Sequence, residues 1–129
     1  MTDVNLPIGV FDSGMGGLTV LAALRQQLPQ EDFFYLGDTA RLPYGTKSAA
    51  TVERYAQQAA GVLVARGIKA LVVACNTASA TALRALAQEF APLPVFGVVE
   101  PGALAACEVA DSSGVTVLAT ESTIAGGAY

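Results

Sequence analysis

The sequence contains no histidine and no tryptophan, and it has only two cysteines, Cys75 and Cys107. Protein zinc sites are built mainly from cysteine and histidine at short, regular spacings, and this chain offers neither a histidine nor a CxxC pair. The sequence therefore predicts no metal site. Because the two cysteines fall in different predicted elements, we expect free thiols rather than a disulfide.

Charged residues are also scarce, at 14% of the chain, and the formal net charge is -4 without any run of like charges. This composition argues against a nucleic-acid groove and against contact with an anionic membrane surface. No apolar stretch approaches the roughly 20 residues that a membrane helix needs, and no basic segment precedes an apolar one as in a secretory signal. We therefore expect a cytoplasmic protein with no nucleic-acid partner and no membrane contact.

Apolar residues are abundant instead. They make up 53% of the 129 residues, and a further 13 residues are glycine. The length is that of one compact domain. Such an apolar excess predicts either a large buried interior or an apolar face that packs against another surface.

Short apolar runs typical of buried strands alternate along the chain with segments of helical periodicity. Strands are predicted at 6–11, 33–36, 71–74, 94–98 and 115–119, and helices at 18–28, 48–66, 76–90 and 103–109, with another opening at 120–123. Strands joined by single helices imply right-handed crossovers and parallel pairing. The predicted fold class is α/β, a three-layer α/β/α arrangement around a mostly parallel sheet.

Ligands of such a sheet gather where the carboxyl ends of the strands meet. Four predicted loops end there: Asp12-Ser13, Gly37-Asp38, Cys75-Asn76 and the stretch after Val98. Just beyond the last of these, the proline and glycine of Glu100-Pro101-Gly102 are strong breaks in regular structure, so a hinge is expected at that point.

Cys75 stands at the end of the apolar run 70–74, where the chain turns into a helix that we expect to begin at Asn76 or Thr77. The amide hydrogens and the positive dipole end of a helix favour a thiolate over a thiol, and a thiolate can act as a base or a nucleophile. A buried cysteine that serves only as a small hydrophobic side chain is the alternative reading of the same stretch.

The turn 12–17, Asp12-Ser13-Gly14-Met15-Gly16-Gly17, is rich in glycine but matches neither the dinucleotide fingerprint nor a phosphate-binding P-loop. Its amide hydrogens at a helix start could hold a carboxylate. Asp12 is then either a functional group at the strand tip or only a helix cap. Likewise, Tyr44-Gly45 is either a ligand clamp or a surface turn.

Three motifs together resemble the glutamate racemases of the aspartate/glutamate racemase family. They are the turn Asp12-Ser13-Gly14-x-Gly16-Gly17-Leu18, Gly37-Asp38 followed by Pro43-Tyr44-Gly45, and Cys75-Asn76-Thr77-Ala78-Ser79. The third motif is common to the whole family, whereas the first two together point to the glutamate branch. The resemblance extends over the whole chain.

This resemblance implies racemisation of L-glutamate to D-glutamate for peptidoglycan biosynthesis, without a cofactor and with two cysteines as the acid/base groups. Cys75 would be one of them. The family's second cysteine stands in a Gly-Cys-Thr-His motif that this chain lacks, and Cys107, predicted in mid-helix among alanines, does not replace it. Asp12, if it lies close to Cys75, could accept the thiol proton as a relay.

Substrate contacts implied by motif position are Asp12, Ser13, Tyr44, Gly45, Asn76 and Thr77, with Thr120 and Thr123 as further contacts to a carboxylate. Glutamate is the expected small-molecule partner, and a homo-oligomer is left open. The family has two similar lobes. We expect residues 1–97 to form the first lobe, and residues 98–129 to form a hinge and the truncated start of a second lobe that is largely absent here.

Two alternatives remain open at this point. The first is a racemase of another amino acid such as aspartate. The reach to the distal carboxylate would decide between the two substrates. The second is an inactive fragment that binds glutamate or a partner protein, because the second cysteine motif is missing.

Overall fold

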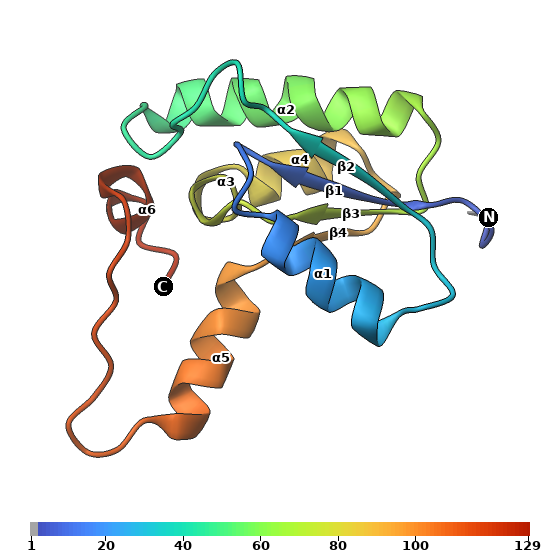
Figure 1. Cartoon of the computed structure of the whole chain (residues 1–129). Coiled ribbons are helices and arrows are strands. Elements are labelled where there is room, and N and C mark those ends of the chain that lie inside the picture. The colour runs from blue at the N-terminus through green and yellow to red at the C-terminus, as the bar shows by residue number, and fades with distance from the viewer. Residues whose placement is uncertain (1–2) are drawn as a thin grey trace.

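A computed structural model describes residues 3–129 and shows four parallel strands in one sheet (Figure 1). The strands are β1 (Ile8–Asp12), β2 (Phe33–Gly37), β3 (Ala70–Val73) and β4 (Val95–Gly97), and they are arranged in the order β2-β1-β3-β4. All five residues of β1 are buried, because this strand lies inside the sheet with helices on both sides. The predicted α/β class and parallel pairing are confirmed.

The described residues also form six helices: α1 (Leu18–Gln27), α2 (Ala49–Ala65), α3 (Asn76–Thr81), α4 (Leu83–Glu89), α5 (Val99–Val109) and α6 (Glu121–Ala125). The chain moves from β1 to β2 on one side and then returns across β1 to β3. Right-handed crossovers in these opposite directions place α1 on one face of the sheet and α2 on the other (Figure 1). Among the described helices, none has the length and apolarity to cross a membrane.

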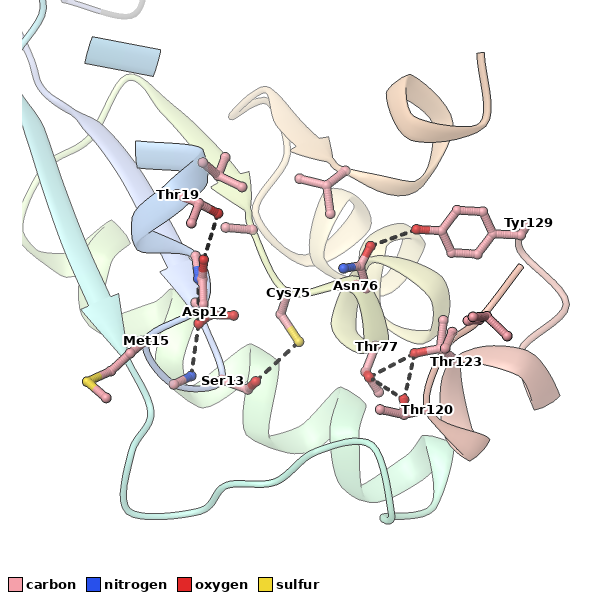
Figure 2. Close-up of a pocket in the computed structure, with 18 residues that line it drawn as sticks. Asp12, Ser13, Met15, Thr19, Cys75, Asn76, Thr77, Thr120, Thr123 and Tyr129 are labelled. Carbon is pink, nitrogen blue, oxygen red and sulfur yellow. Dashed lines mark hydrogen bonds between the residues drawn. The ribbon is translucent and has the colours of Figure 1, made fainter. Parts of the chain in front are cut away.

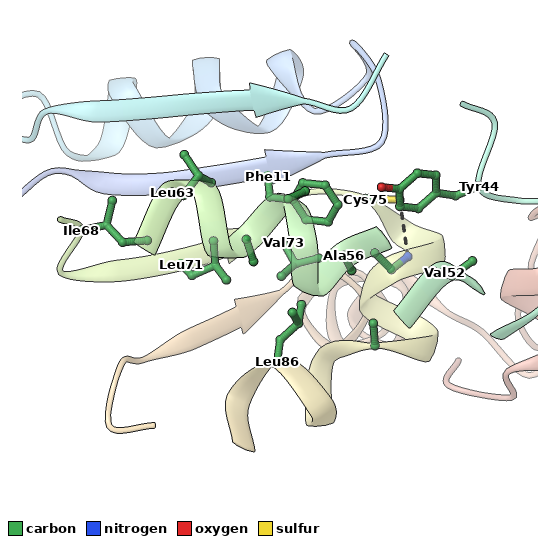
Figure 3. Close-up of a cluster of buried hydrophobic side chains, with 14 residues drawn as sticks. Phe11, Tyr44, Val52, Ala56, Leu63, Ile68, Leu71, Val73, Cys75 and Leu86 are labelled. Atoms are coloured by element: carbon green, nitrogen blue, oxygen red, sulfur yellow. Dashed lines mark hydrogen bonds between the residues drawn. The ribbon is translucent and has the colours of Figure 1, made fainter. Parts of the chain in front are cut away.

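The hydrophobic core lies between the sheet and helices α2, α3 and α4 (Figure 3). Phe11, Leu71 and Val73 reach into it from the strands, and Val52 and Leu86 reach into it from the helices, all with no exposed surface. Full burial of a side chain such as Leu71 contributes about 1.5–3 kcal/mol. This core fixes the carboxyl ends of β1 and β3 side by side, where the functional side chains emerge.

The long helix α2 begins and ends as the sequence predicts. The Ser48 hydroxyl accepts a hydrogen bond from the Thr51 amide at 3.3 Å and so caps the first turn. Gly67 follows the last turn with a φ of 78°, which a residue without a side chain adopts at little cost.

The helix predicted over 76–90 is wrong as a single element, because it is interrupted at Ala82 and forms α3 and α4. The Thr81 hydroxyl donates to the Thr77 carbonyl at 2.8 Å, a bond to the preceding turn that tends to bend helices. The start of the helix is confirmed at Asn76, one of the two positions that the sequence predicts. Cys75 itself is the N-cap of α3, and Asn76 is the first helical residue.

The region after β4 differs most from prediction. Helix α5 already begins at Val99, so Glu100-Pro101-Gly102 lies in its first turn, and the hinge expected at this point stays a prediction. Proline fits there because the first amides of a helix have no partner within the helix. The strand predicted at 115–119 is wrong, because this segment is exposed and pairs with no strand among residues 3–129. The division of the chain at residue 97 stays a prediction.

Candidate active site

A cavity of about 500 Å³ opens at the carboxyl edge of the sheet (Figure 2). Its walls come from the turn after β1, the end of β3 with the start of α3, and the C-terminal segment around α6. Seven of the predicted site residues line it: Asp12, Ser13, Cys75, Asn76, Thr77, Thr120 and Thr123. The parallel order of the strands therefore brings two of the three sequence motifs into one site.

Cys75 is 6% exposed and presents its sulfur to this cavity. The thiol donates to the Ser13 hydroxyl at 3.4 Å, and the sulfur accepts a hydrogen bond from the Ala78 amide at 3.4 Å. Cys75 also belongs to the hydrophobic core, so both readings of the sequence apply to the same side chain. An amide donor and a rotatable hydroxyl are the partners that a sulfur with changing charge requires.

Asp12 ends β1 and is 5% exposed. Its Oδ2 accepts hydrogen bonds from the Gly14 amide at 3.1 Å, the Gly17 amide at 3.0 Å and the Tyr35 hydroxyl at 3.3 Å. The carboxylate therefore ties the glycine turn together, as a capping role requires. Because the Cys75 thiol donates to Ser13 rather than to Asp12, a proton relay to Asp12 would need an intermediary.

Tyr35 contributes to the site although the sequence analysis did not single it out. Its hydroxyl donates to the Gly14 carbonyl at 3.0 Å as well as to Asp12, and so connects β2 with the turn after β1. Burial, and then the negative charge of Asp12, raise the pKa of Tyr35 from 10.0 to about 12, so the phenol stays a donor to a higher pH than an ordinary tyrosine does. The only signal in the sequence is a polar-tipped residue within an apolar strand.

Three threonine hydroxyls form a closed ring at the opposite wall of the cavity, and we call Thr77, Thr120 and Thr123 the threonine cluster (Figure 2). The oxygen of Thr77 lies 3.1 Å from that of Thr120 and 2.9 Å from that of Thr123, and the latter two are 2.9 Å apart. Each hydroxyl has one proton to donate. A carboxylate would recruit donors from this ring by rotating them toward itself.

Asn76 lies on the rim between the two walls of the cavity. Its Oδ1 accepts a hydrogen bond from the Tyr129 hydroxyl at 2.7 Å, and Figure 2 shows the amide nitrogen on the side of Cys75. The side chain is exposed, so its amide hydrogens are accessible to a ligand in the cavity.

Tyr44 and Gly45 do not line this cavity. The Tyr44 side chain is 1% exposed, packs against the rings of Phe11 and Tyr55, and donates its hydroxyl to Asp38 at 2.5 Å. Burial and the Asp38 acceptor raise the pKa of Tyr44 above its ordinary range. Tyr44 is therefore neither a surface turn nor a side-chain clamp on the cavity, and its contact with substrate stays a prediction, as does that of Gly45.

Among residues 3–129, no group of three or more Cys, Asp or Glu side chains lies close enough together to hold a metal ion. Asp12 is the only residue with a charged side chain among those that line the cavity. An amino-acid ligand would thus meet one carboxylate, suited to its ammonium group, and neutral hydroxyl and amide donors for its carboxylates.

Comparison with known proteins confirms the family. Residues 8–129 match the Asp/Glu/Hydantoin racemase family, and the chain belongs to it. It is similar to a glutamate racemase of Geobacter metallireducens, with 60% identity over 122 residues that cover 95% of this chain and 45% of the relative. The predicted resemblance to the glutamate branch is therefore confirmed.

Solved structures agree with this assignment. The structure of glutamate racemase from Thermus thermophilus in complex with beta-chloro-D-alanine has a TM-score of 0.89 and 55% identity, covering 99% of this chain and 48% of that one. The Francisella tularensis enzyme in complex with D-glutamate has a TM-score of 0.87 and 46% identity, covering 97% and 46%. The chain spans about half the length of the relatives that it matches.

Proposed function

We propose that the complete protein interconverts L-glutamate and D-glutamate without a cofactor, and that this chain carries one of the two acid/base groups, Cys75. The observation that supports this most is the position of the thiol, which faces a cavity lined by hydroxyl and amide donors and is itself hydrogen-bonded to Ser13 and to the Ala78 amide. The similarity to glutamate racemases indicates which amino acid the cavity would bind.

Inversion at an α-carbon requires a base on one face and an acid on the other. A single thiol returns the proton to the side from which it came, so Cys75 alone would exchange the α-proton without inverting the centre. Cys107 is exposed on α5 and does not line the cavity of Cys75. The relatives are about twice as long as this chain. We propose that the second acid/base group of the complete protein comes from the part that corresponds to the other half of the relatives.

Removal of the α-proton leaves negative charge that spreads onto the adjacent carboxylate. Hydrogen-bond donors directed at that carboxylate stabilise the charge as it develops. We propose that Ser13, Asn76 and the threonine cluster provide these donors, and that Asp12 faces the substrate's ammonium group. No organic cofactor is needed in this scheme, because the donors take over part of the charge stabilisation that an electron-accepting ring would otherwise provide.

The test is to follow the α-hydrogen signal by NMR while the chain is incubated in deuterated water with L-glutamate and, separately, with D-glutamate. We expect exchange of one enantiomer without inversion, and its loss in Cys75→Ser. The matched control is Cys107→Ser, an exposed thiol outside the cavity, which should leave exchange unchanged. No exchange by a chain shown to be folded would overturn the proposed role of Cys75.

The same experiment addresses the finer parts of the proposal. Full racemisation by this chain alone would mean that another group, such as Cys107 or a second copy of the chain, completes the pair. In a parallel incubation with aspartate, faster exchange than with glutamate would contradict the proposed substrate. We further propose that the D-glutamate formed serves peptidoglycan biosynthesis in the cytoplasm; the homo-oligomer stays a prediction.

A further inference from the structure

Asp38 lies outside the cavity but is one of the few buried charged residues of the chain. It follows β2, and its backbone amide donates to the Asp12 carbonyl at 2.9 Å. Its side chain is 9% exposed, and Oδ2 accepts hydrogen bonds from the Tyr44 hydroxyl at 2.5 Å and from Arg41 Nε at 2.7 Å. A carboxylate this deeply buried needs both partners, because an unpaired buried charge is costly.

The Arg41 side chain extends this contact to helix α2. Its guanidinium carbon lies 4.3 Å from the centre of the Tyr55 ring, and the guanidinium also donates to the Gln58 side chain. The Tyr55 ring packs in turn on that of Tyr44, with centroids 5.9 Å apart. The loop between Asp38 and Tyr44 is therefore held against α2, a helix that contributes to the hydrophobic core.

Gly45, the residue after Tyr44, connects this loop to the far wall of the cavity. The Gly45 carbonyl accepts a hydrogen bond from the Ser122 amide at 3.0 Å, in the first turn of α6. A Cβ at Gly45 would lie 2.4 Å from Cβ of Thr120, which shows how closely the loop backbone rests on that residue. Thr120 and Thr123, which flank Ser122, are two members of the threonine cluster.

We propose that Asp38 is a positioning residue of the cavity: through Tyr44 and Gly45 it holds Thr120 and Thr123 where their hydroxyls meet Thr77. The inference rests on the proposed function insofar as the threonine cluster binds the substrate's carboxylate. The position of the cluster itself does not depend on any ligand. Asp38 touches no residue of the cluster directly, so its effect passes through the backbone of the Tyr44–Gly45 loop.

The geometry requires both the negative charge of Asp38 and the phenol of Tyr44. Asn at position 38 would keep an acceptor oxygen but lose the ionic attraction to Arg41. Phe at position 44 would keep the packed ring and lose only the hydroxyl. Loss of one such charge-assisted hydrogen bond corresponds to about a tenfold or larger change in an equilibrium constant, which we expect to appear in the docking of the loop on α6.

Amide hydrogen exchange measured by NMR on the 129-residue chain reports this docking directly, through the amide of Ser122. The reference is the Ala74 amide, which donates to the Phe11 carbonyl at 2.7 Å inside the sheet. In Asp38→Asn and Tyr44→Phe we expect the Ser122 amide to exchange about tenfold faster while the exchange rate of the Ala74 amide is unchanged. The Ser122 amide reports local opening of the loop, which is measured separately from global unfolding. Leu86→Val, a core truncation on α4, is the matched control that lowers global stability without touching the loop.

Titration with L-glutamate and D-glutamate gives the second readout. If the loop positions the threonine cluster, the dissociation constant rises about five- to tenfold in both loop variants and remains near the wild-type value in Leu86→Val. Restoration of Ser122 protection and of affinity in Asp38→Glu would support the requirement for charge.

The two proposals fail in different ways. Unchanged Ser122 exchange in Tyr44→Phe, or equal acceleration in Leu86→Val, would overturn the positioning role. Faster Ser122 exchange with unaltered glutamate affinity would overturn the link between the loop and the ligand. If wild-type protein binds neither glutamate enantiomer, the proposed function fails, whereas the exchange data still decide whether Asp38 holds the loop.

Discussion

Gly45→Ala adds a single methyl group and is the smallest substitution that would disturb the contact between the Tyr44–Gly45 loop and Thr120. Built on the present backbone, the new Cβ would lie 2.4 Å from Cβ, 2.5 Å from Cγ2 and 2.7 Å from Oγ1 of Thr120. Carbon atoms in favourable contact are about 3.5–4.0 Å apart, so the two segments would have to separate by about 1 Å. Since Gly45 has no positive φ, the effect would come from this collision and not from backbone strain.

Two costs follow from the separation. Overpacking costs about 1–3 kcal/mol when the surroundings cannot give way, and weakening the hydrogen bond from the Ser122 amide to the Gly45 carbonyl costs about 0.5–1.5 kcal/mol. The short helix α6 has an exposed outer side and can shift outward, which relieves part of the collision. We therefore expect Gly45→Ala to lower the free energy of unfolding by about 2 kcal/mol.

Gly61→Ala is the matched substitution and should have the opposite sign. Gly61 lies inside α2, and a Cβ there would meet nothing within 4 Å. Replacing glycine by alanine in a helix interior stabilises by about 0.5–1 kcal/mol. Urea unfolding of both variants with equal m-values measures the difference. If Gly45→Ala is as stable as the wild type while Gly61→Ala gains as expected, the loop does not rest on Thr120 in solution and the reasoning is refuted.

Two further substitutions test single contacts. The raised pKa of Tyr44 means that the unfolded chain loses this proton first, from its ordinary pKa of 10.0. The contribution of Tyr44 to stability is therefore constant below that pH and falls as pH rises above it. Tyr44→Phe should reduce the fall in denaturant titrations, and an equal fall in the variant would contradict this. Ser79→Ala removes a hydroxyl that donates to the Val73 carbonyl at 2.8 Å and accepts from the Val98 amide at 3.2 Å. We expect the free energy of unfolding, measured with urea, to fall by about 1–3 kcal/mol. In the exposed control Ser113→Ala it should fall by no more than about 0.5 kcal/mol.

The sequence could predict the sheet and the side of it on which ligands gather, because these follow from local patterns. A parallel strand covered on both faces is a continuous apolar run, as in β1 and β3, and the helix between two such runs fixes the crossover. The cap at Ser48 and the positive φ of Gly67 are also local features that amino-acid type reveals. These rules were enough to place Asp12, Ser13 and Cys75 together.

The remaining features depend on contacts between distant segments. Residues 115–119 have the composition of a strand, but a strand also needs a neighbour, and in the described part of the chain none lies alongside. The motif containing Tyr44 indicated a functional loop, yet only the fold shows that its phenol turns inward to Asp38 while its neighbour Gly45 meets Thr120. No periodicity predicts that a cysteine will be the N-cap of α3, because sulfur is an uncommon capping acceptor.

The two adjacent residues at the end of β1 have different tasks, and their hydrogen bonds explain why. Asp12 is fixed by three donors, two of them backbone amides, so its carboxylate moves only if the turn moves. Ser13 presents a hydroxyl that can accept a hydrogen bond from the Cys75 thiol or, after rotation about one bond, donate one to a thiolate. Under the proposed function, a change of charge on the sulfur would be met by rotation of a single hydroxyl while the surrounding amides and carboxylate stay in place, which is the preorganisation that proton transfer at carbon requires.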